Sequence, residues 1–138
     1  MSIQAENSTF TMKKLHNDQV VVTLRSDGIV HVSFLPNTEI TVEFQQVLLD
    51  MYNEITGGAK SLFVFDGGEF VSITKEAREN AVAIEDSTPT KASAIVVKNL
   101  GQKIIADFYY KVNRPKQPYK VFWQFDKAIE WLHSAAAE

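Results

Sequence analysis

The sequence has 138 residues, the size of one domain; 45% are hydrophobic and 22% charged, ordinary values for a globular protein. Its net charge is −3 and its pI is near 5.6, which argues against a dedicated nucleic-acid binder. It contains no cysteine, which excludes disulfides, thiolate metal sites and cysteine nucleophiles.

The N-terminal residues are polar. We expect residues 1–8 to form a loose segment and residues 9–138 to form a single domain. The first residues contain no apolar run typical of a signal peptide, and no segment reaches the roughly 18 apolar residues of a membrane span. The sequence therefore favours a cytoplasmic protein.

Two β-rich runs follow, one on each side of Asp27-Gly28. An Asp-Gly pair between such runs predicts a β-hairpin, because both residues tolerate positive φ angles. In the second run, apolar residues at positions 30, 32 and 34 alternate with polar ones. We therefore expect one face of this strand to be buried and His31 to point to solvent. Residues 9–15 are expected to add an edge strand.

The rest of the chain alternates between predicted helices and short apolar runs. Helices are predicted at 41–58, 74–85, 100–112 and 125–134, and strands at 61–65, 92–97 and 119–123. The first helix has Thr38 or Thr41 as its cap and Gly57-Gly58 as its end, and Asp126 is the predicted N-cap of the last. The helix at 100–112 carries an apolar stripe, which we expect to face the core: Leu100, Ile104, Ile105, Phe108 and Val112.

The order β-β-α-β-α-β-α-β-α predicts an α/β domain with a mixed sheet. The N-terminal hairpin is antiparallel, the later strands are parallel, and the helices pack on the sheet. The chain resembles a STAS-type domain in three stretches, residues 27–41, 61–81 and 118–134. The resemblance is closest to small stand-alone bacterial proteins that are similar to anti-sigma-factor antagonists. It covers about residues 17–134 and includes no catalytic motif, since the family has none.

The resemblance implies a non-enzymatic protein-interaction or regulatory module, without cofactor or metal, whose partner is another protein or a second copy of the chain. Some STAS domains are switched by phosphorylation of a Ser or Thr where a helix begins, and Ser72 and Thr74 stand at that place here. The acidic-serine pair and the following glycine of switchable members are missing. Either hydroxyl also suits a plain N-cap, which we favour over a degenerate switch. Lys75 and Arg78 would favour a phosphate there.

Asp66 stands where the strand at 61–65 is expected to end. The following Gly67-Gly68 pair lacks the Lys and Ser/Thr of a phosphate-binding loop, so we exclude a nucleotide loop. Ligands in open α/β sheets gather at the carboxyl ends of strands, so Asp66 is a candidate for the interaction site or for chemistry with Lys98. We favour a turn residue, whose carboxylate accepts hydrogen bonds from the amides of Gly68 and Glu69.

Between Lys91 and Lys120 the chain has seven basic residues and one acid. This basic edge includes Lys98, Lys103, Lys111, Arg114 and Lys116. Such an edge suits peripheral contact with anionic lipid. STAS domains share their layout with CRAL-TRIO lipid-transfer domains. The alternative function is therefore binding of a small molecule or anionic lipid in an apolar pocket between the sheet and the helix that starts near Leu100. That function requires a cavity of roughly 300 Å³ or more.

Overall fold

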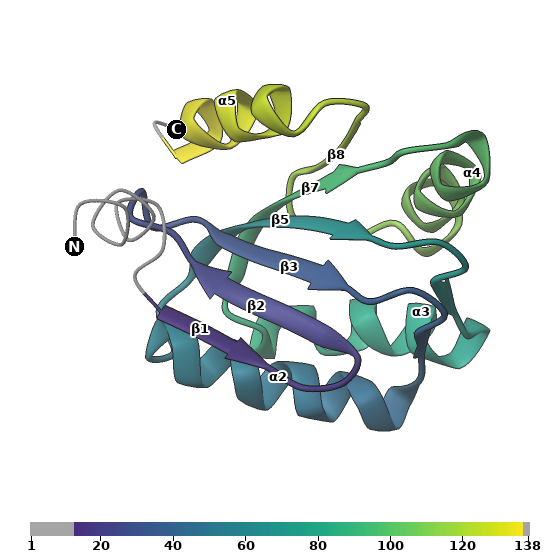
Figure 1. Cartoon of the computed structure of the whole chain (residues 1–138), viewed down its shortest axis with the longest axis horizontal. Helices are drawn as coiled ribbons and strands as arrows, with labels where there is room; N and C mark the ends of the chain where they lie inside the picture. The colour runs from purple at the N-terminus through teal and green to yellow at the C-terminus, as the bar shows by residue number, and fades with distance from the viewer. Residues whose placement is uncertain (1–12, 137–138) are drawn as a thin grey trace.

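A six-stranded mixed sheet runs through the computed structural model, which describes residues 13–136 (Figure 1). In pairing order its strands are β1 (Lys13–His16), β2 (Val20–Leu24), β3 (Val30–Phe34), β5 (Ser61–Gly67), β7 (Thr90–Val96) and β8 (Tyr119–Phe122). Neighbours are antiparallel from β1 to β3 and parallel from β3 to β8. The predicted mixed sheet is confirmed, with β1 as its edge strand. The segment predicted to be loose, 1–8, lies outside the described residues.

The predicted hairpin joins β2 to β3, but its turn differs from the expected one. The N–H of Arg25 donates to the carbonyl of Ile29 at 2.9 Å, so the loop is longer than two residues. Gly28 has a φ of 84°, whereas Asp27 is not among the residues with positive φ. The Asp27 carboxylate instead accepts hydrogen bonds from the Arg25 guanidinium and the Ile29 N–H. The side chain of Asp27 therefore stabilises the turn as an acceptor.

Four α-helices follow the predicted order: α2 (Val42–Thr56), α3 (Lys75–Ala83), α4 (Leu100–Phe108) and α5 (Phe125–Ala136). The hydroxyl of Thr41 accepts the N–H of Phe44 at 3.1 Å and caps α2, and Gly57 ends this helix with a φ of 66°. The prediction that Asp126 caps the last helix is wrong, because α5 already begins at Phe125. Asp126 lies in the first turn, where the helix dipole favours a negative charge.

Four short elements were not predicted. A 3₁₀ turn, η1 (Glu85–Ser87), follows α3, and a π-helical turn, η2 (Tyr109–Asn113), continues α4. Two strands of two residues each, β4 (Glu39–Ile40) and β6 (Ser72–Ile73), pair in parallel beside the main sheet. Elements of this length carry no readable periodicity, so pattern analysis cannot find them.

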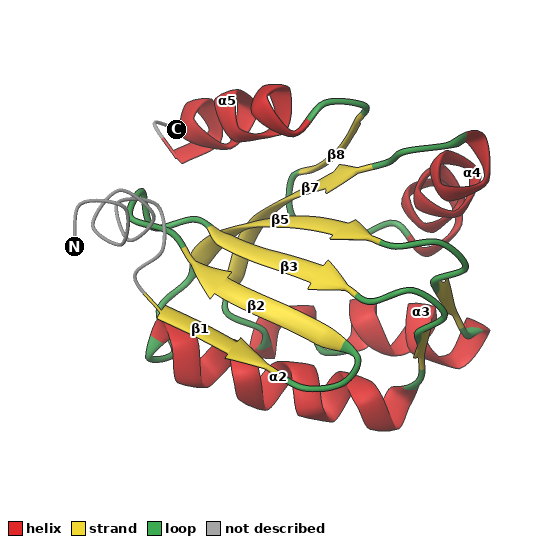
Figure 2. Cartoon of the chain, in the orientation of Figure 1, coloured by secondary structure: helices red, strands yellow, loops and turns green. Residues whose placement is uncertain are grey.

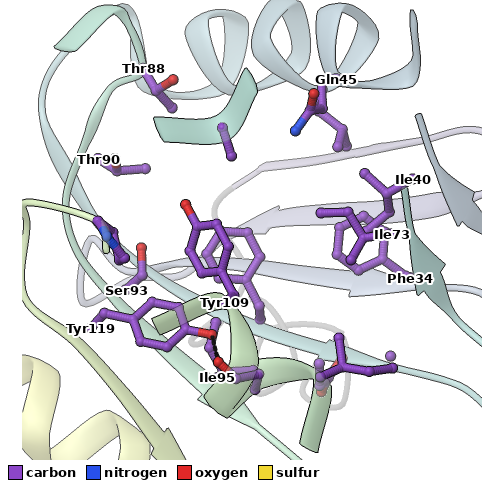
Figure 3. A pocket seen from close by; sticks show the side chains of 18 of the residues that line it. Phe34, Ile40, Gln45, Ile73, Thr88, Thr90, Ser93, Ile95, Tyr109 and Tyr119 are labelled. Atoms are coloured by element: carbon purple, nitrogen blue, oxygen red, sulfur yellow. Dashed lines mark hydrogen bonds between the residues drawn. The ribbon is translucent and has the colours of Figure 1, made fainter. Parts of the chain in front are cut away.

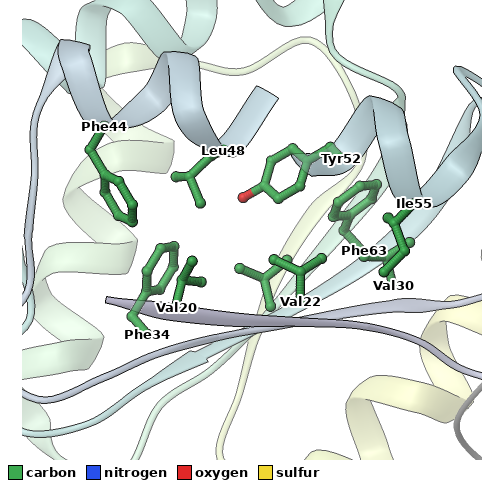
Figure 4. Close-up of a cluster of buried hydrophobic side chains, with 10 residues drawn as sticks. Val20, Val22, Val30, Phe34, Phe44, Leu48, Tyr52, Ile55 and Phe63 are labelled. Carbon is green, nitrogen blue, oxygen red and sulfur yellow. The ribbon is translucent and has the colours of Figure 1, made fainter. Parts of the chain in front are cut away.

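The sheet has a hydrophobic core on each face. Figure 2 shows α2 and α3 on one side of the sheet and α5 on the other. Beneath α2, the strands and the helix contribute the buried side chains drawn in Figure 4, which include Val20, Val22, Val30, Phe34, Phe44, Leu48, Tyr52, Ile55 and Phe63. Beneath α5 lie Ile29, Leu62, Val64, Ala92, Ala94, Val96, Ala128 and Leu132. Both faces of β5 are therefore covered, as its continuous apolar run predicts.

Helix α4 departs from the prediction. Most of the apolar stripe expected in the core faces outward, since Leu100, Ile104 and Phe108 are 66%, 59% and 44% exposed. Ile105 of the same stripe borders the space between α4 and the sheet. Ala106 is the buried residue of this helix. α4 lies off the carboxyl ends of β5 and β7 (Figure 1), continues directly into η2 and contacts β8. The periodicity identifies an amphipathic helix but not the surface that its apolar face meets.

Candidate functional site

A cavity of about 310 Å³ lies between the sheet and helices α2, α3 and α4 (Figure 3); we call it the sheet–helix cavity. Most of its lining is apolar and comes from distant parts of the chain, including Phe34, Ile40, Leu48, Leu49, Phe65, Ile73, Ala81, Ile84, Ile95, Ile105 and Ala106. The cavity that the alternative function requires is therefore present. Its volume lies at the lower end of the range, roughly 300 to 1,000 Å³, of pockets that hold small ligands.

The cavity exists because the helices stand away from the central strands on this face. β7 lies between β5 and β8, yet its cavity-side residues Ser93 and Ile95 are only half-buried. On the opposite face, Ala92 and Ala94 of the same strand are fully covered by α5. Helix α3 packs chiefly on α2 and η2 rather than on the sheet. A layer of side chains that would fill this face in a closely packed domain is thus missing.

Two tyrosine rings line one side of the cavity, Tyr109 from the π-helical turn η2 and Tyr119 from β8. Such turns are rare and occur often at functional sites. Tyr109, its first residue, lies 5.4 Å from Tyr119 of β8 between ring centroids. The hydroxyl of Tyr119 donates to the carbonyl of Ala106 at 3.0 Å. That of Tyr109 points into the cavity (Figure 3) and has no hydrogen-bond partner among residues 13–136. Tyr109 therefore offers an unused polar group in a mostly apolar lining.

Next to Tyr109 is the buried acid Glu85, which is 8% exposed. Its Oε1 and Oε2 accept the backbone N–H groups of Lys116 at 3.0 Å and Gln117 at 3.1 Å. Burial, together with the Glu85 charge, raises the pKa of Tyr109 to about 12, so the phenol stays protonated near neutral pH. The Thr90 hydroxyl donates to Gln117 Oε1 at 2.9 Å. These residues form the polar end of the cavity.

Asp66 does not have the contacts that the sequence predicted. Instead of accepting the amides of Gly68 and Glu69, its Oδ2 lies 3.0 Å from Nε2 of His31, and the Gly68 N–H donates to the carbonyl of Phe34. The expectation that His31 points to solvent is wrong, because its side chain is 27% exposed and packs against Phe125 of α5 at 4.9 Å between centroids. The alternation along β5 directs the side chains of this pair to the α5 face, although Asp66, near the end of β5, also borders the sheet–helix cavity.

The candidate switch residues at the start of α3 are brought together, and one of them, Ser72, borders the same cavity as Asp66. The Thr74 hydroxyl accepts the Ala77 N–H at 3.0 Å and caps the helix, as the favoured interpretation has it. Ser72 and Lys75 are exposed. The Arg78 guanidinium lies 4.9 Å from the centroid of the Phe108 ring and so connects α3 to α4. The exposed positions of Ser72 and Lys75 leave them accessible to a partner.

The basic edge is partly neutralised within the chain. Lys103 pairs with Asp107 one turn along α4, and Nζ of Lys116 lies 3.2 Å from Asp86. Lys98, Lys111 and Arg114 are exposed. Within residues 13–136, no helix has both the length and the apolar character needed to cross a membrane.

The fold is similar to one seen in a crystal structure from Shewanella loihica PV-4, of an uncharacterized protein of the DUF3478 family with a SpoIIAA-like fold. The TM-score is 0.57 at 16% sequence identity, and the match covers 87% of this chain and 97% of that chain. At this identity the likeness shows the fold alone, and it confirms the STAS-type resemblance. No match was found among curated proteins. A family model described as a domain of unknown function, DUF7793, matches residues 22–136, and the chain therefore belongs to the DUF7793 family.

Proposed function

We propose that this domain is a non-enzymatic binding module that holds a small apolar molecule in the sheet–helix cavity. The observation that carries the proposal is the cavity itself, about 310 Å³ in volume and mostly apolar in its lining. Protein interiors are packed to crystal-like density, with few voids larger than a water molecule. A mostly apolar space this large in a domain of 138 residues suits a ligand.

The neighbouring packing supports a built pocket rather than a loosely packed domain. The adjoining core is tight, with Val32 and Phe63 at 0% exposure. The void is confined to the part of the sheet face over which α3 and α4 stand off, and η2 directs Tyr109 into it. A rigid core beside a helix of few contacts gives a pocket whose wall can adapt to a ligand.

The placement of ionisable groups supports a role without catalysis. Within the sheet, the described residues include one His–Asp pair, His31 and Asp66; Asp66 borders the cavity, but its Oδ2 is held by His31, whose ring packs on Phe125 of α5. At the polar end, both oxygens of Glu85 are already hydrogen-bonded to backbone amides. These two bonds hold the Glu85 carboxylate against the loop at residues 116 and 117, so we assign it a structural role.

A cavity-filling variant tests the proposal. Ala81 lines the cavity, whereas Ala83 is exposed on the same helix, so Ala81→Trp and Ala83→Trp are a matched pair. Nile red is neutral and fluoresces in apolar surroundings. It should bind wild type and Ala83→Trp at one molecule per chain, and Ala81→Trp at least about tenfold more weakly because the indole occupies the cavity. Equal binding to all three folded proteins, or none to wild type, would refute the proposal.

A second candidate function is the protein interaction that the STAS-type resemblance implies. The exposed apolar stripe of α4 favours it, together with Phe70, which is 79% exposed and has a φ of 61°. The side chain of Gln102 on α4 approaches the carbonyls of Gly67 and Gly68 at 3.3 Å, which places the Phe70 loop beside α4. Large exposed apolar side chains that occur together often mark contact surfaces.

Affinity capture from the native cell, quantified by mass spectrometry, tests this second candidate. A partner that docks on α4 should be lost with Ile104→Asp and retained with Val47→Asp, since both residues are exposed but lie on different helices. The start of α3 is tested in the same way with Thr74→Glu and Arg78→Glu. If the captured partners bind these two variants and Ile104→Asp as they bind wild type, neither α4 nor the start of α3 is the contact surface.

A further inference from the structure

We infer that the ligand of the sheet–helix cavity is a neutral amphiphile: an apolar body with one hydrogen-bonding head group, such as an alcohol, and not an anion such as a fatty acid. The inference rests on the proposed function, because it specifies what the same cavity binds. It follows from the charges that line the cavity, from the polar groups that remain unpaired there, and from its size.

Among the described residues that line the cavity, none is Lys, Arg or His, whereas Asp66 and Glu85 are acids. The carboxylate of Glu85 takes up the backbone N–H groups of Lys116 and Gln117, so these donors are not available to a ligand. Taking an anion out of water without a paired cation is costly, and a second carboxylate beside Glu85 would also be repelled. The lining therefore discriminates against an anionic head group.

The basic edge does not change this balance. None of Lys98, Lys103, Lys111, Arg114 and Lys116 belongs to the described lining. Lys116 pairs with Asp86 and Lys103 with Asp107, while Lys60 donates to the carbonyls of Asp86 and Thr88 outside the cavity. The basic edge and the cavity are therefore separate features.

A hydroxyl donor that points into the cavity favours an uncharged head group. The Thr88 hydroxyl donates to the carbonyl of Ile84 at 3.0 Å and that of Thr90 to Gln117, so both are satisfied. The Tyr109 hydroxyl, by contrast, has no hydrogen-bond partner among residues 13–136, and it points into the cavity (Figure 3). An alcohol or carbonyl oxygen would accept its hydrogen. A cavity of about 310 Å³ is at the lower end of the range of ligand pockets and suits a small amphiphile.

The test compares 1-octanol with octanoate at pH 7.5, which share a chain length and differ in charge. Each is titrated into the ¹⁵N-labelled full chain, and backbone amide shifts report both affinity and location. We expect 1-octanol to shift the amides of cavity residues such as Ser93 and Ile95 and to bind at least about tenfold more tightly than octanoate. Tyr109→Phe should weaken the binding of 1-octanol about three- to tenfold, because it removes the hydroxyl donor. Tyr110→Phe should not, because Tyr110 is 53% exposed and outside the lining.

A second pair of variants tests the charge argument by adding the missing cation. Ile105 lines the cavity and is 42% exposed, whereas Ile104 is 59% exposed and outside the lining. Ile105→Lys should bring octanoate affinity at least to parity with 1-octanol, and Ile104→Lys should leave the wild-type preference unchanged.

The outcomes separate the inference from the proposed function. Octanoate binding in the wild-type cavity as tightly as 1-octanol, or Nile red binding there while 1-octanol does not, would overturn the inference and leave the proposed function standing. If Nile red, 1-octanol and octanoate all leave the cavity amides unchanged, the proposed function fails as well.

Discussion

The imidazole of His31 and the carboxylate of Asp66 lie 3.0 Å apart and join the parallel strands β3 and β5 on the face that carries α5. Phe125, the first residue of α5, packs against the His31 ring. Burial by itself would raise the pKa of Asp66, but the hydrogen bond and the charge of His31 hold that pKa below its usual range. The ionised carboxylate thus contributes to the attachment of α5 to the sheet.

Acid should weaken the fold through Asp66. Its pKa is lower in the folded than in the unfolded chain, so the unfolded chain binds more protons as the pH falls. The contribution of Asp66 is complete above its unfolded pKa, near 3.8, and is lost as the pH falls through its folded pKa. Asp66→Asn should lower the free energy of unfolding by about 1–3 kcal/mol at pH 7 and flatten its decline between about pH 5 and pH 3.

Urea unfolding at a series of pH values, followed by tryptophan fluorescence, measures this effect. Asp18→Asn is the control, since Asp18 is exposed. Burial would raise the pKa of Asp27, but Arg25 holds that pKa low. The stability of Asp66→Asn should therefore still fall somewhat in acid, because Asp27 remains. Identical pH profiles for wild type and Asp66→Asn would contradict the role of the His31–Asp66 pair.

The hydroxyl of Thr74 should be worth about 1 kcal/mol to the fold as a helix cap. Thr74→Ala removes the acceptor of the Ala77 N–H and should lower the free energy of unfolding by that amount, whereas Thr74→Ser keeps the acceptor and most of the stability. Ser72→Ala is the matched control, because Ser72 is exposed and precedes the helix. Thermal unfolding by circular dichroism is the measurement. A Thr74→Ala protein as stable as Ser72→Ala would argue against the cap.

The order of the long elements could be predicted because their signals are local. Alternating valines indicate β3, the Thr41 and Gly57 caps delimit α2, and the continuous apolar run at 61–65 indicates a strand covered on both faces. Elements of two residues, such as β4 and β6, carry no such signal. The His31–Asp66 pair was missed because the register of β3 against β5 creates it across 35 residues of sequence.

The cavity was predicted in general position but not in composition. Its lining joins Tyr52 of α2, Glu85 of η1, Tyr109 of η2 and Tyr119 of β8, and no spacing in the sequence links these four. Glu85 reads as the last residue of a helix, and its burial depends on the backbone amides of residues 116 and 117. A void is set by how far helices stand from a sheet, which is a property of packing rather than of pattern.

The exposed stripe of α4 can be tested directly, because its apolar periodicity predicted burial that the structure does not show. Ile104→Ser should change the free energy of unfolding by no more than about 0.5 kcal/mol, because the side chain is 59% exposed. Leu48→Ala, on the buried stripe of α2, should cost about 2–5 kcal/mol. Urea unfolding of both variants measures the contrast. A loss of more than about 2 kcal/mol in Ile104→Ser would place α4 against the sheet in solution.

Two glycines that flank the cavity should respond oppositely to alanine. A Cβ at Gly68 would lie 2.7 Å from Cγ of Pro36 and 2.9 Å from its backbone nitrogen, so the loop after β5 must shift. Overpacking of this kind costs about 1–3 kcal/mol. A Cβ at Gly101, in the first turn of α4, would meet only Oδ1 of Asn99 at 3.4 Å. Because alanine reduces the conformational freedom of the unfolded chain, Gly101→Ala should raise the free energy of unfolding by about 0.4–1 kcal/mol.

Urea unfolding again gives the free energies, and Nile red titration shows whether the cavity responds. Gln102 contacts the carbonyl of Gly68 at 3.3 Å, so a shifted loop in Gly68→Ala should move the start of α4 and weaken Nile red binding. Gly101→Ala should bind Nile red as wild type does, because Gly101 is outside the described lining. If Gly68→Ala keeps both its stability and its Nile red binding, the close approach of Pro36 does not fix this loop. The contact between the Arg78 guanidinium and the Phe108 ring would then be the next candidate for holding α4 in place.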